Sequence, residues 1–174
     1  MAIKKILTEP NKLLRQISKT VEKVKDEERK LMDDMLDTMY AANGIGLAAI
    51  QIGIPKRIIV IDISKKEDEK KPMFFVNPVI LKKNDEKATY EEGCLSVPNQ
   101  FAEVDRPSSC DVEYLDYEGN KKILKAEGLL ATCIQHEMDH LEGILFIDYL
   151  SKLKETMIVK KLSKQKGKAD RIVV

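Results

Sequence analysis

The segment from about Gly128 to Glu142 places the strongest constraint on how this chain can fold. Apolar residues recur there at helical spacing and cover most of the circumference of a helix. They are Leu129, Leu130, Cys133, Ile134, Met138 and Leu141. A helix that is apolar on most sides must lie deep in a protein core, and Gly143 provides its end. The rest of the chain is therefore expected to surround this segment.

The same segment carries both histidines of the chain, His136 and His140. Residues four apart project from one face of a helix about one turn from each other, so these two imidazoles can hold one divalent cation. Glu137 lies within reach of a water molecule beside such a cation, as in the H-E-x-x-H motif. The alternative is two histidines with a chance neighbour, but unpartnered polar groups in an apolar helix cost several kcal/mol.

A catalytic metal normally takes a third protein ligand and keeps one position open for water. In the peptidase motif H-E-x-x-H-x-x-G-x-x-H that ligand is a third histidine. Here Phe146 occupies the corresponding position, and the chain contains no other histidine. The third ligand must therefore be a cysteine or a carboxylate.

Three cysteines and two glutamates compete for this role. Cys133 lies about 10 Å along the helix axis from His140, so we expect it to pack beside the site instead. Cys110 lies at the start of a predicted strand and is expected in the core. Cys94 follows Gly93, which allows an unusual backbone turn, and is the favoured ligand. The rival ligands are Glu91 and Glu92.

The stretch GIGLAAIQ, Gly44 to Gln51, also matches the dinucleotide pattern G-x-G-x-x-A. That pattern requires a strand before it and a helix after it. Here a predicted helix, Asp26–Ala42, precedes the glycines, and Gly53 and Pro55 follow, so we reject nucleotide binding. Glycines also allow close approach of a backbone to a ligand, and Gln51 could present its amide to a carbonyl oxygen. The alternative is a tight turn with a solvent-facing Gln51.

The remaining pattern predicts an α+β fold. Helices are expected at 26–42, 128–142 and 151–165, and strands at 57–63, 73–81, 111–117 and 121–126. An interruption is expected at Asn77-Pro78, and a charged loop at 64–72. The last helix is expected to present Leu153, Met157, Ile158 and Leu162 on one face. We predict one catalytic domain over residues 1–174, with antiparallel strands around the central metal-binding helix and helices near both termini.

Composition excludes few functions but indicates a compartment. The net charge of +1 gives no sign of a DNA partner, and no apolar run approaches the roughly 18 residues of a membrane span. Three cysteines cannot all pair within the chain, which is typical of a reducing compartment. The start, MAIKKIL, lacks the features of a secretory signal. We expect a cytoplasmic monomer, with an organellar transit peptide in the basic residues 1–23 as the alternative.

Three stretches together resemble the motifs of the peptide deformylase family. They are GIGLAAIQ at 44–51, EEGCLS at 91–96 and QHEMDHLEG at 135–143, complete and in order, and the likeness extends over nearly the whole chain. The resemblance implies removal of the formyl group from N-formylmethionine of nascent polypeptides. It also implies Cys94, His136 and His140 as ligands of a divalent metal, typically Fe(II), with zinc, nickel or cobalt able to occupy the site. Thiolate and imidazole ligands by themselves suit zinc equally well.

The resemblance further assigns roles in the reaction. A metal-activated water would attack the formyl carbon, and Glu137 would carry its proton to the leaving amine. The Gln51 amide and the Leu95 backbone N–H would stabilise the charge that develops on the formyl oxygen. The methionine pocket and substrate chain would contact Ile45, Gly46, Leu129 and Cys133. Phe101 and Thr132 depart from the common residues of the family, which leaves fine substrate preference open.

The end of the chain, residues 151–174, is basic. Its charged residues are Lys152, Lys154, Lys160, Lys161, Lys164, Lys166, Lys168 and Arg171, against Glu155 and Asp170. A charge run is usually a solvated helix face, and attraction to RNA is the functional alternative. In similar bacterial deformylases a C-terminal helix docks on the ribosome near the exit tunnel, so the resemblance favours ribosome contact.

Two rival functions stay open on the sequence. The first is a metallopeptidase of the H-E-x-x-H type, against which Phe146 and a cysteine ligand both count. The second is a structural zinc site within a basic RNA-binding module. Structural sites are closed by four protein ligands, and Glu137 would then have no role.

Overall fold

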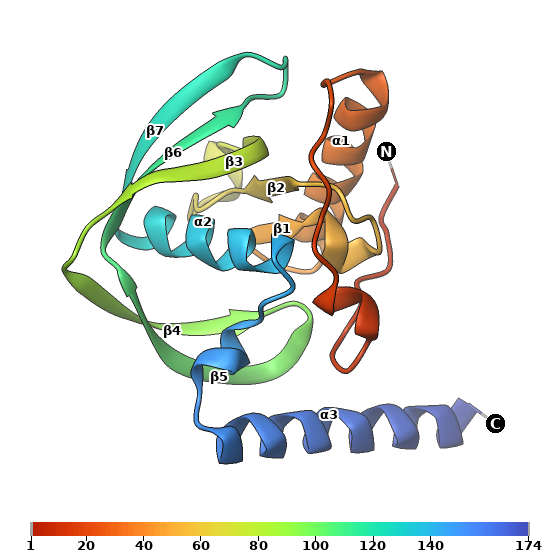
Figure 1. Ribbon diagram of the computed structural model, residues 1–174. Coiled ribbons are helices and arrows are strands. Elements are labelled where there is room, and N and C mark those ends of the chain that lie inside the picture. Colours follow the sequence, from red (N-terminus) through yellow and green to blue (C-terminus); the bar gives the residue numbers. More distant parts are fainter. Residues whose placement is uncertain (1, 174) are drawn as a thin grey trace.

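The computed structural model describes the backbone of residues 2–173 and the side chains of residues 2–164. Figure 1 shows the arrangement of its elements. The α-helices are α1 (Asp26–Ala41), α2 (Gly128–Leu141) and α3 (Lys152–Val173). The strands are β1 (Gly46–Ala48), β2 (Ile58–Ile61), β3 (Met73–Lys83), β4 (Lys87–Cys94), β5 (Val97–Pro107), β6 (Ser109–Leu115) and β7 (Lys121–Glu127). Short 3₁₀ helices are η1 (Lys12–Arg15), η2 (Ala49–Ile52), η3 (Glu67–Glu69) and η4 (Phe146–Tyr149).

Two antiparallel sheets enclose the central helix. The larger has the strand order β1-β2-β3-β6-β7, and the smaller is the β4–β5 hairpin. Helix α2 runs between the two sheets, while α1 and α3 lie on opposite sides of the molecule (Figure 1). The α+β class and the arrangement of antiparallel strands around a central helix are therefore confirmed.

Strand β2 explains how two helices share one sheet. Its four residues are all buried because helices cover both faces of the sheet at this point. Ile59 and Ile61 belong to the apolar cluster that contains Ile134 of α2. Ile58 and Val60 belong to the cluster that contains the three buried methionines of α1. This double coverage packs α2 against one face of the sheet and α1 against the other.

Strand β3 continues through the predicted interruption. The pairing of β3 with β6 shifts in register between Val76 and Val79, and Asn77 adopts a positive φ of 50°. The Asn77 side chain accepts a hydrogen bond from the Val21 backbone N–H at 2.8 Å and donates one to the Val21 carbonyl at 2.7 Å. The break is thus a β-bulge tied to the N-terminal segment, and the strand extends to Lys83.

The β4–β5 hairpin was not predicted from the sequence. Strand β4 reads KATYEEGC, with few apolar residues, and most of its residues are exposed or half-exposed. The two strands pair along their whole lengths, from Lys87 opposite Pro107 to Cys94 opposite Val97. Pairing between the two strands stabilises them, and the apolar periodicity of either strand alone reports little of this.

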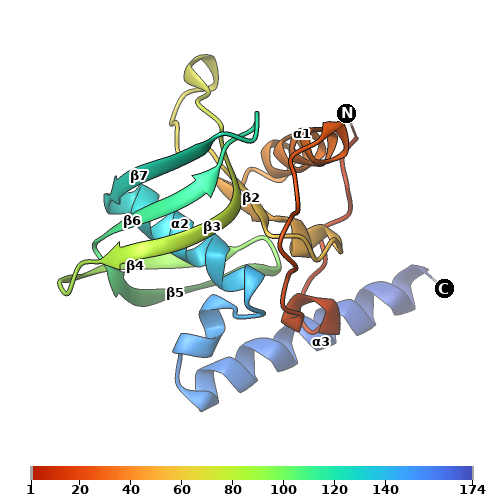
Figure 2. The ribbon, with the colours of Figure 1, turned by 45° about the horizontal axis from the view of Figure 1, so that its top comes forward.

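The prediction for the face of the last helix is partly wrong. Leu162 is buried and Ile158 half-buried, in a cluster with Val97, Phe146 and neighbouring residues. Leu153 and Met157, in contrast, are 72% and 61% exposed. Helix α3 makes its main contacts with β5 and η4 and extends past the body of the molecule (Figure 2). Part of its apolar face is therefore left uncovered.

The C-terminal helix is also longer than predicted, since it runs to Val173. The side chains of Lys166, Lys168, Asp170 and Arg171 lie outside the described residues. Within residues 2–173, no helix combines the length and the apolar character needed to span a bilayer.

Candidate metal centre and reaction pocket

The structure brings the three predicted metal ligands together. His136 and His140 come from α2, and Cys94 is the last residue of β4. One ligand atom from each lies within 4.8 Å of the others, and Cys94 Sγ is 3.3 Å from His140 Nε2. A thiolate with two imidazoles suits zinc or a first-row transition metal. No fourth protein donor joins this group within the described residues, which leaves a coordination position for a small ligand.

The turn at the end of β4 aims the thiol at α2. The pairing of β4 with β5 shifts in register between Gly93 and Cys94, and such a bulge redirects a side chain. A Cβ at Gly93 would lie 2.6 Å from the ring of Phe101 on the paired strand. Gly93 therefore leaves the space that the Phe101 ring occupies over this end of β4.

Glu92, which the sequence left open as a rival ligand, lies outside the group of three donors and contacts the predicted ligand His136 instead. Its Oε1 lies 2.8 Å from Nδ1 of His136. The buried Arg106 holds the same carboxylate through two hydrogen bonds, from Nε at 2.7 Å and from Nη2 at 3.0 Å. Glu91 is exposed, so neither rival ligand reaches the centre. A carboxylate on the outer nitrogen of a ligating histidine orients the ring and raises its basicity.

Arg106 is a site residue that the sequence analysis missed. An arginine in a strand of mixed charge carries no local signal of burial. Its pairing with Glu92, fourteen positions back along the hairpin, exists only when β4 and β5 are paired.

The electrostatics of the cluster favour a cation. Burial raises the pKa of Glu92, but hydrogen bonds from His136 and Arg106 outweigh burial and lower it. Burial lowers the pKa of His136, but its hydrogen bonds to Cys94 and Glu92 outweigh burial and raise it. For His140, burial and the charge of His136 both lower the pKa, so its imidazole is neutral. The carboxylate of Glu92 therefore remains anionic beside His136, where it would stabilise a cation bound to the imidazole.

Glu137 is buried with one oxygen free. Its Oε2 has no hydrogen-bond partner among the described residues. Burial raises its pKa to about 7, with the charges of His136 and Arg106 acting in the opposite direction. A Cβ at Gly46 would lie 2.5 Å from Glu137 Oε1, so this glycine provides the space that the carboxylate occupies. The free oxygen fits a water molecule on a bound cation, and a pKa near neutrality suits a group that takes up and returns a proton.

Gln51 is buried and fixed, which excludes the solvent-facing alternative. Its Oε1 accepts a hydrogen bond from the Ala48 N–H at 2.9 Å. Its Nε2 donates to Ser96 Oγ at 3.0 Å and to Cys94 Sγ at 3.5 Å. The amide nitrogen of Gln51 therefore lies beside Cys94, one of the three predicted ligands. In the stretch Gly44–Gln51, helix α1 precedes the glycines and only the short 3₁₀ helix η2 follows β1. Nucleotide binding requires a strand before the glycines and an α-helix after them, so this context does not fit it.

A cavity of about 530 Å³ opens over these groups. Its lining includes the predicted pocket residues Ile45, Gly46, Leu129 and Cys133. The predicted N–H donor Leu95 also lines it, as do Phe101 and Thr132. Burial, with the charge of Glu137, raises the pKa of Cys133 to about 12, so its thiol is protonated and forms part of an apolar wall. Phe101 is 65% exposed at the cavity rim. The cavity can hold an apolar side chain beside a metal, a proton carrier and a fixed amide.

Comparison with known proteins gives consistent results. The family model described as Polypeptide deformylase matches residues 3–156. A peptide deformylase of Pelagibacter ubique (strain HTCC1062) is 75% identical over 174 residues, which is 100% of both chains. The crystal structure of peptide deformylase from Ehrlichia chaffeensis has a TM-score of 0.92 at 44% identity, covering 97% of this chain and 99% of that one. A complex of the Ehrlichia chaffeensis protein with actinonin has a TM-score of 0.89 at 46% identity, covering 95% and 98%.

Proposed function

The chain belongs to the polypeptide deformylase family, amide hydrolases that remove the N-formyl group from nascent polypeptides, and we propose which of its residues perform this reaction. Cys94, His136 and His140 are proposed to hold the metal, and Glu137 to carry the proton. The observation that supports this assignment most strongly is the convergence of three donor atoms within 4.8 Å beside a buried carboxylate with a free oxygen.

The chain's own residues divide the work of the reaction. A divalent metal, when bound, supplies Lewis acidity that activates a water molecule near neutral pH. Glu137 takes the proton of that water and returns it to the leaving amine. The Gln51 amide and the Leu95 backbone N–H donate to the formyl oxygen as its charge develops, and one such donor is worth about 2.7–4 kcal/mol. Formate and a free N-terminus result.

The cavity positions the substrate for this chemistry. Ile45, Leu129 and the protonated Cys133 provide apolar walls for a methionine side chain. The backbone of Gly46 is proposed to bind the substrate chain, since it lines the cavity directly beside Glu137. Binding the remote side chain places the formyl carbon against the reacting groups, which is how binding energy becomes rate.

We propose Fe(II) as the metal in the cell, with zinc, nickel or cobalt able to occupy the same ligands. The donor set alone is compatible with each of them. The metallopeptidase alternative is not favoured, because Phe146 stands in place of a third histidine and its ring lies 6.2 Å from that of His136. The structural-zinc alternative would require four protein donors, whereas three gather within the described residues.

The decisive experiment measures formate release from formyl-Met-Ala-Ser by anaerobically purified, Fe(II)-loaded protein. A Cys94→Ala variant, assayed for both metal and activity, serves as the control. Release by the native protein alone ties the reaction to the proposed ligand. Absence of release from native protein that demonstrably contains metal would overturn the assignment. Inhibition by actinonin, the ligand of the Ehrlichia chaffeensis complex, supplies an independent check of the pocket.

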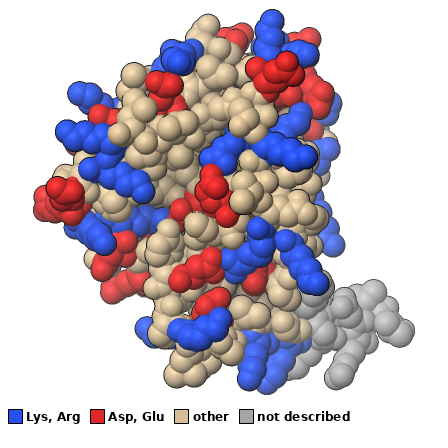
Figure 3. All heavy atoms as spheres, viewed as in Figure 1, with Lys and Arg blue, Asp and Glu red and all other residues tan. Residues whose placement is uncertain are grey.

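We further propose that this single catalytic domain, residues 1–174, is a cytoplasmic monomer that contacts the ribosome through its basic C-terminal helix and tail, residues 151–174. The described lysines of α3 are exposed, and Lys and Arg side chains lie along the lower edge of the molecule where α3 begins (Figure 3). The described lysines of α3 are Lys152, Lys154, Lys160, Lys161 and Lys164. Attraction to RNA phosphates would make this contact dependent on salt.

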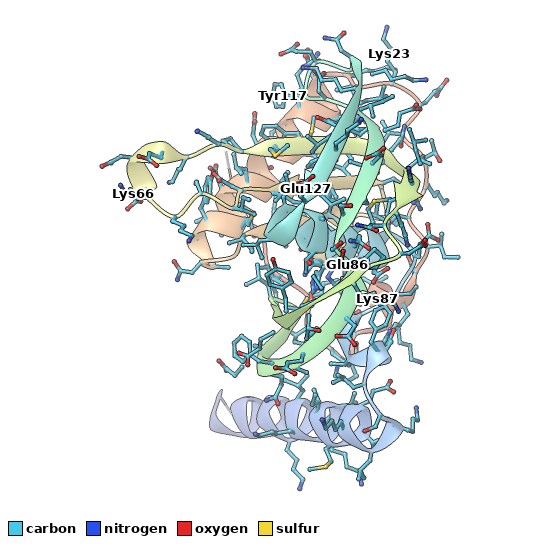
Figure 4. The ribbon with its side chains drawn as sticks, turned by 90° about the vertical axis from the view of Figure 1, so that its left-hand side faces the viewer. Lys23, Lys66, Glu86, Lys87, Tyr117 and Glu127 are labelled. Atoms are coloured by element: carbon cyan, nitrogen blue, oxygen red, sulfur yellow. The ribbon has the colours of Figure 1, made fainter. Side chains whose placement is uncertain are left out.

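The packing of α3 decides how the ribosome proposal is tested. Deleting residues 151–174 would also remove Leu162 from the core, so charge changes are preferable. Replacing Lys154, Lys160, Lys161 and Lys164 by Glu should weaken ribosome binding without changing hydrolysis of short peptides. The matched control replaces Lys65, Lys66, Lys70 and Lys71 by Glu. These lysines lie in the exposed loop between β2 and β3, away from α3 (Figure 4). Equal, salt-insensitive binding by native protein and both variants would refute the proposal.

A further inference from the structure

A chain of hydrogen bonds connects a surface tyrosine to the metal ligand His136. The Tyr149 hydroxyl donates to Asp139 Oδ2 at 2.7 Å. Arg106 Nη1 donates to the same oxygen at 2.8 Å. Arg106 then grips Glu92 with its other two nitrogens, and Glu92 Oε1 lies 2.8 Å from His136 Nδ1. Every link is within hydrogen-bonding distance. Three side chains, those of Asp139, Arg106 and Glu92, therefore connect Tyr149 to the imidazole of His136.

Tyr149 contacts both Asp139 and Arg106, the two network residues farthest from His136. Its hydroxyl binds Asp139, and its ring centroid lies 4.9 Å from the guanidinium carbon of Arg106. The Arg106 side chain is 5% exposed and that of Asp139 is 21% exposed. Tyr149 itself is 52% exposed and forms the lid between this ion pair and solvent. Excluding water from a charged pair strengthens it, and a ring face over a guanidinium adds a cation–π contribution.

The short helix η4 also contacts His136 directly. Phe146, at the start of η4, is buried, with its ring plane inclined by 25° to the imidazole at a centroid distance of 6.2 Å. Phe146 and Tyr149 are three residues apart, which places them on one side of a 3₁₀ helix. Between them, Asp148 accepts a hydrogen bond from Arg15 Nη1 at 2.6 Å, which anchors η4 to the N-terminal segment. One rigid turn therefore borders the imidazole at one end and its carboxylate network at the other.

We infer that Tyr149 is a positioning residue: by holding Asp139 and covering Arg106, it fixes the Arg106 fork on Glu92 and thereby the orientation of the His136 imidazole. This inference rests on the proposed role of His136 as a metal ligand. Because η4 leads directly into α3 at Lys152, the turn that begins the C-terminal helix also orients the metal ligand. Neither the hydroxyl nor the ring of Tyr149 touches the reaction cavity.

The test variant is Tyr149→Phe, which removes only the hydroxyl. The matched control is Tyr117→Phe, because Tyr117 also donates from its hydroxyl to an aspartate, Asp33 Oδ2, at 3.1 Å. Tyr117 lies at the opposite end of the molecule from α3 (Figure 4). Asp139→Asn, a second change in the network, keeps the test informative if one variant folds poorly.

Each variant is loaded with Co(II), and its visible absorption and its rate of metal release to a chelator are measured. Partners of metal-ligating side chains typically contribute about 10–100-fold to metal affinity or activity, so Tyr149→Phe should release Co(II) about tenfold faster. Its Co(II)–thiolate absorption should shift, and kcat for formyl-Met-Ala-Ser should fall with KM unchanged. Asp139→Asn should show the same changes, and Tyr117→Phe should match the native protein.

A merely structural role predicts a different result. Tyr149→Phe would then lower the melting temperature as Tyr117→Phe does, with native Co(II) absorption and release, and that outcome would overturn the inference. The proposed function fails separately, through the absence of formate release from the native metal-loaded protein. Even in that case, the Co(II) absorption and the rate of Co(II) release show whether Tyr149 positions the metal site.

Discussion

Helices α2 and α3 are both built from apolar and charged residues, but the protein treats them in opposite ways. Helix α2 lies between two sheets, and its His136, Glu137 and His140 are each less than a tenth exposed. Helix α3 rests on β5 and η4 along one side, and leaves Leu153, Met157 and its described lysines in solvent. Polar side chains form a buried candidate reaction centre in one helix and a solvated surface in the other.

The difference shows what burial does to a charged group. In α2, His136 is held by the carboxylate of Glu92, which is held in turn by Arg106. Low dielectric strengthens each of these links and makes the loss of any partner expensive. In α3, Lys152 and Glu155 lie 3.6 Å apart with the lysine 88% exposed, and such pairs contribute little. Substitutions of the same chemical type should therefore have very unequal effects in the two helices.

The largest expected contrast concerns a single glutamate in each helix. Glu137→Ala should retain the metal but lower kcat by about 10²–10⁴, the usual contribution of a positioned proton carrier. Glu155→Ala on α3 should leave kcat unchanged. Formate release normalised to bound metal measures both. A Glu137→Ala protein with native activity would remove the proton-carrier role.

Breaking an ion pair should give the next contrast. Arg106→Met leaves Glu92 and Asp139 without their partner, and removing one member of a buried pair costs about 3–5 kcal/mol of folding free energy. Lys152→Met, which removes the same kind of charge from α3, should cost less than about 0.5 kcal/mol. Urea denaturation of both variants provides the values. Similar losses in the two would mean that Arg106 is held no more tightly than a surface residue.

The pH dependence of stability should show the effect of burial on a single carboxyl group of α2. The pKa of Glu137 rises from 4.5 to about 7 on folding, so the unfolded chain releases this proton first and stability falls as pH increases across that window. In chelator-treated protein the loss should be roughly 2–4 kcal/mol relative to Glu137→Gln, which lacks the titration. Denaturation at pH 4.5 and pH 8 compares the two. Parallel profiles of stability against pH in the two proteins would show that folding does not raise the pKa of Glu137.

The smallest effect distinguishes the two sides of α3 itself. Leu162→Ala removes a buried side chain from the cluster with Phe146 and should cost about 2 kcal/mol. Leu153→Ala, on the exposed side, should change stability by less than about 0.5 kcal/mol. Thermal unfolding of the two variants measures the difference. Equal costs would indicate that the exposed side is covered in solution.

Much of the site could be predicted from local sequence. The four-residue spacing of His136 and His140 on an apolar helix indicated a metal pair, and the absence of another histidine limited the third ligand to a cysteine or carboxylate. The helix-distance argument placed Cys133 beside the site, and Cys133 is not among the three donors that lie within 4.8 Å of one another. Residue spacing alone could not separate Cys94 from Glu92, because they are two positions apart in one strand, and the resemblance to a family favoured the cysteine.

The sequence by itself determined what periodicity and composition can encode: the buried helix, its ligand spacing and the α+β class. Only the tertiary structure decided which distant groups meet. The bulge at Gly93 turns Cys94 toward the histidines. The pairing of β4 with β5 brings Arg106 within hydrogen-bonding distance of Glu92. The physical reason is that a helix repeats over a few residues, whereas the partners of a buried charge are selected by desolvation and packing across the whole chain.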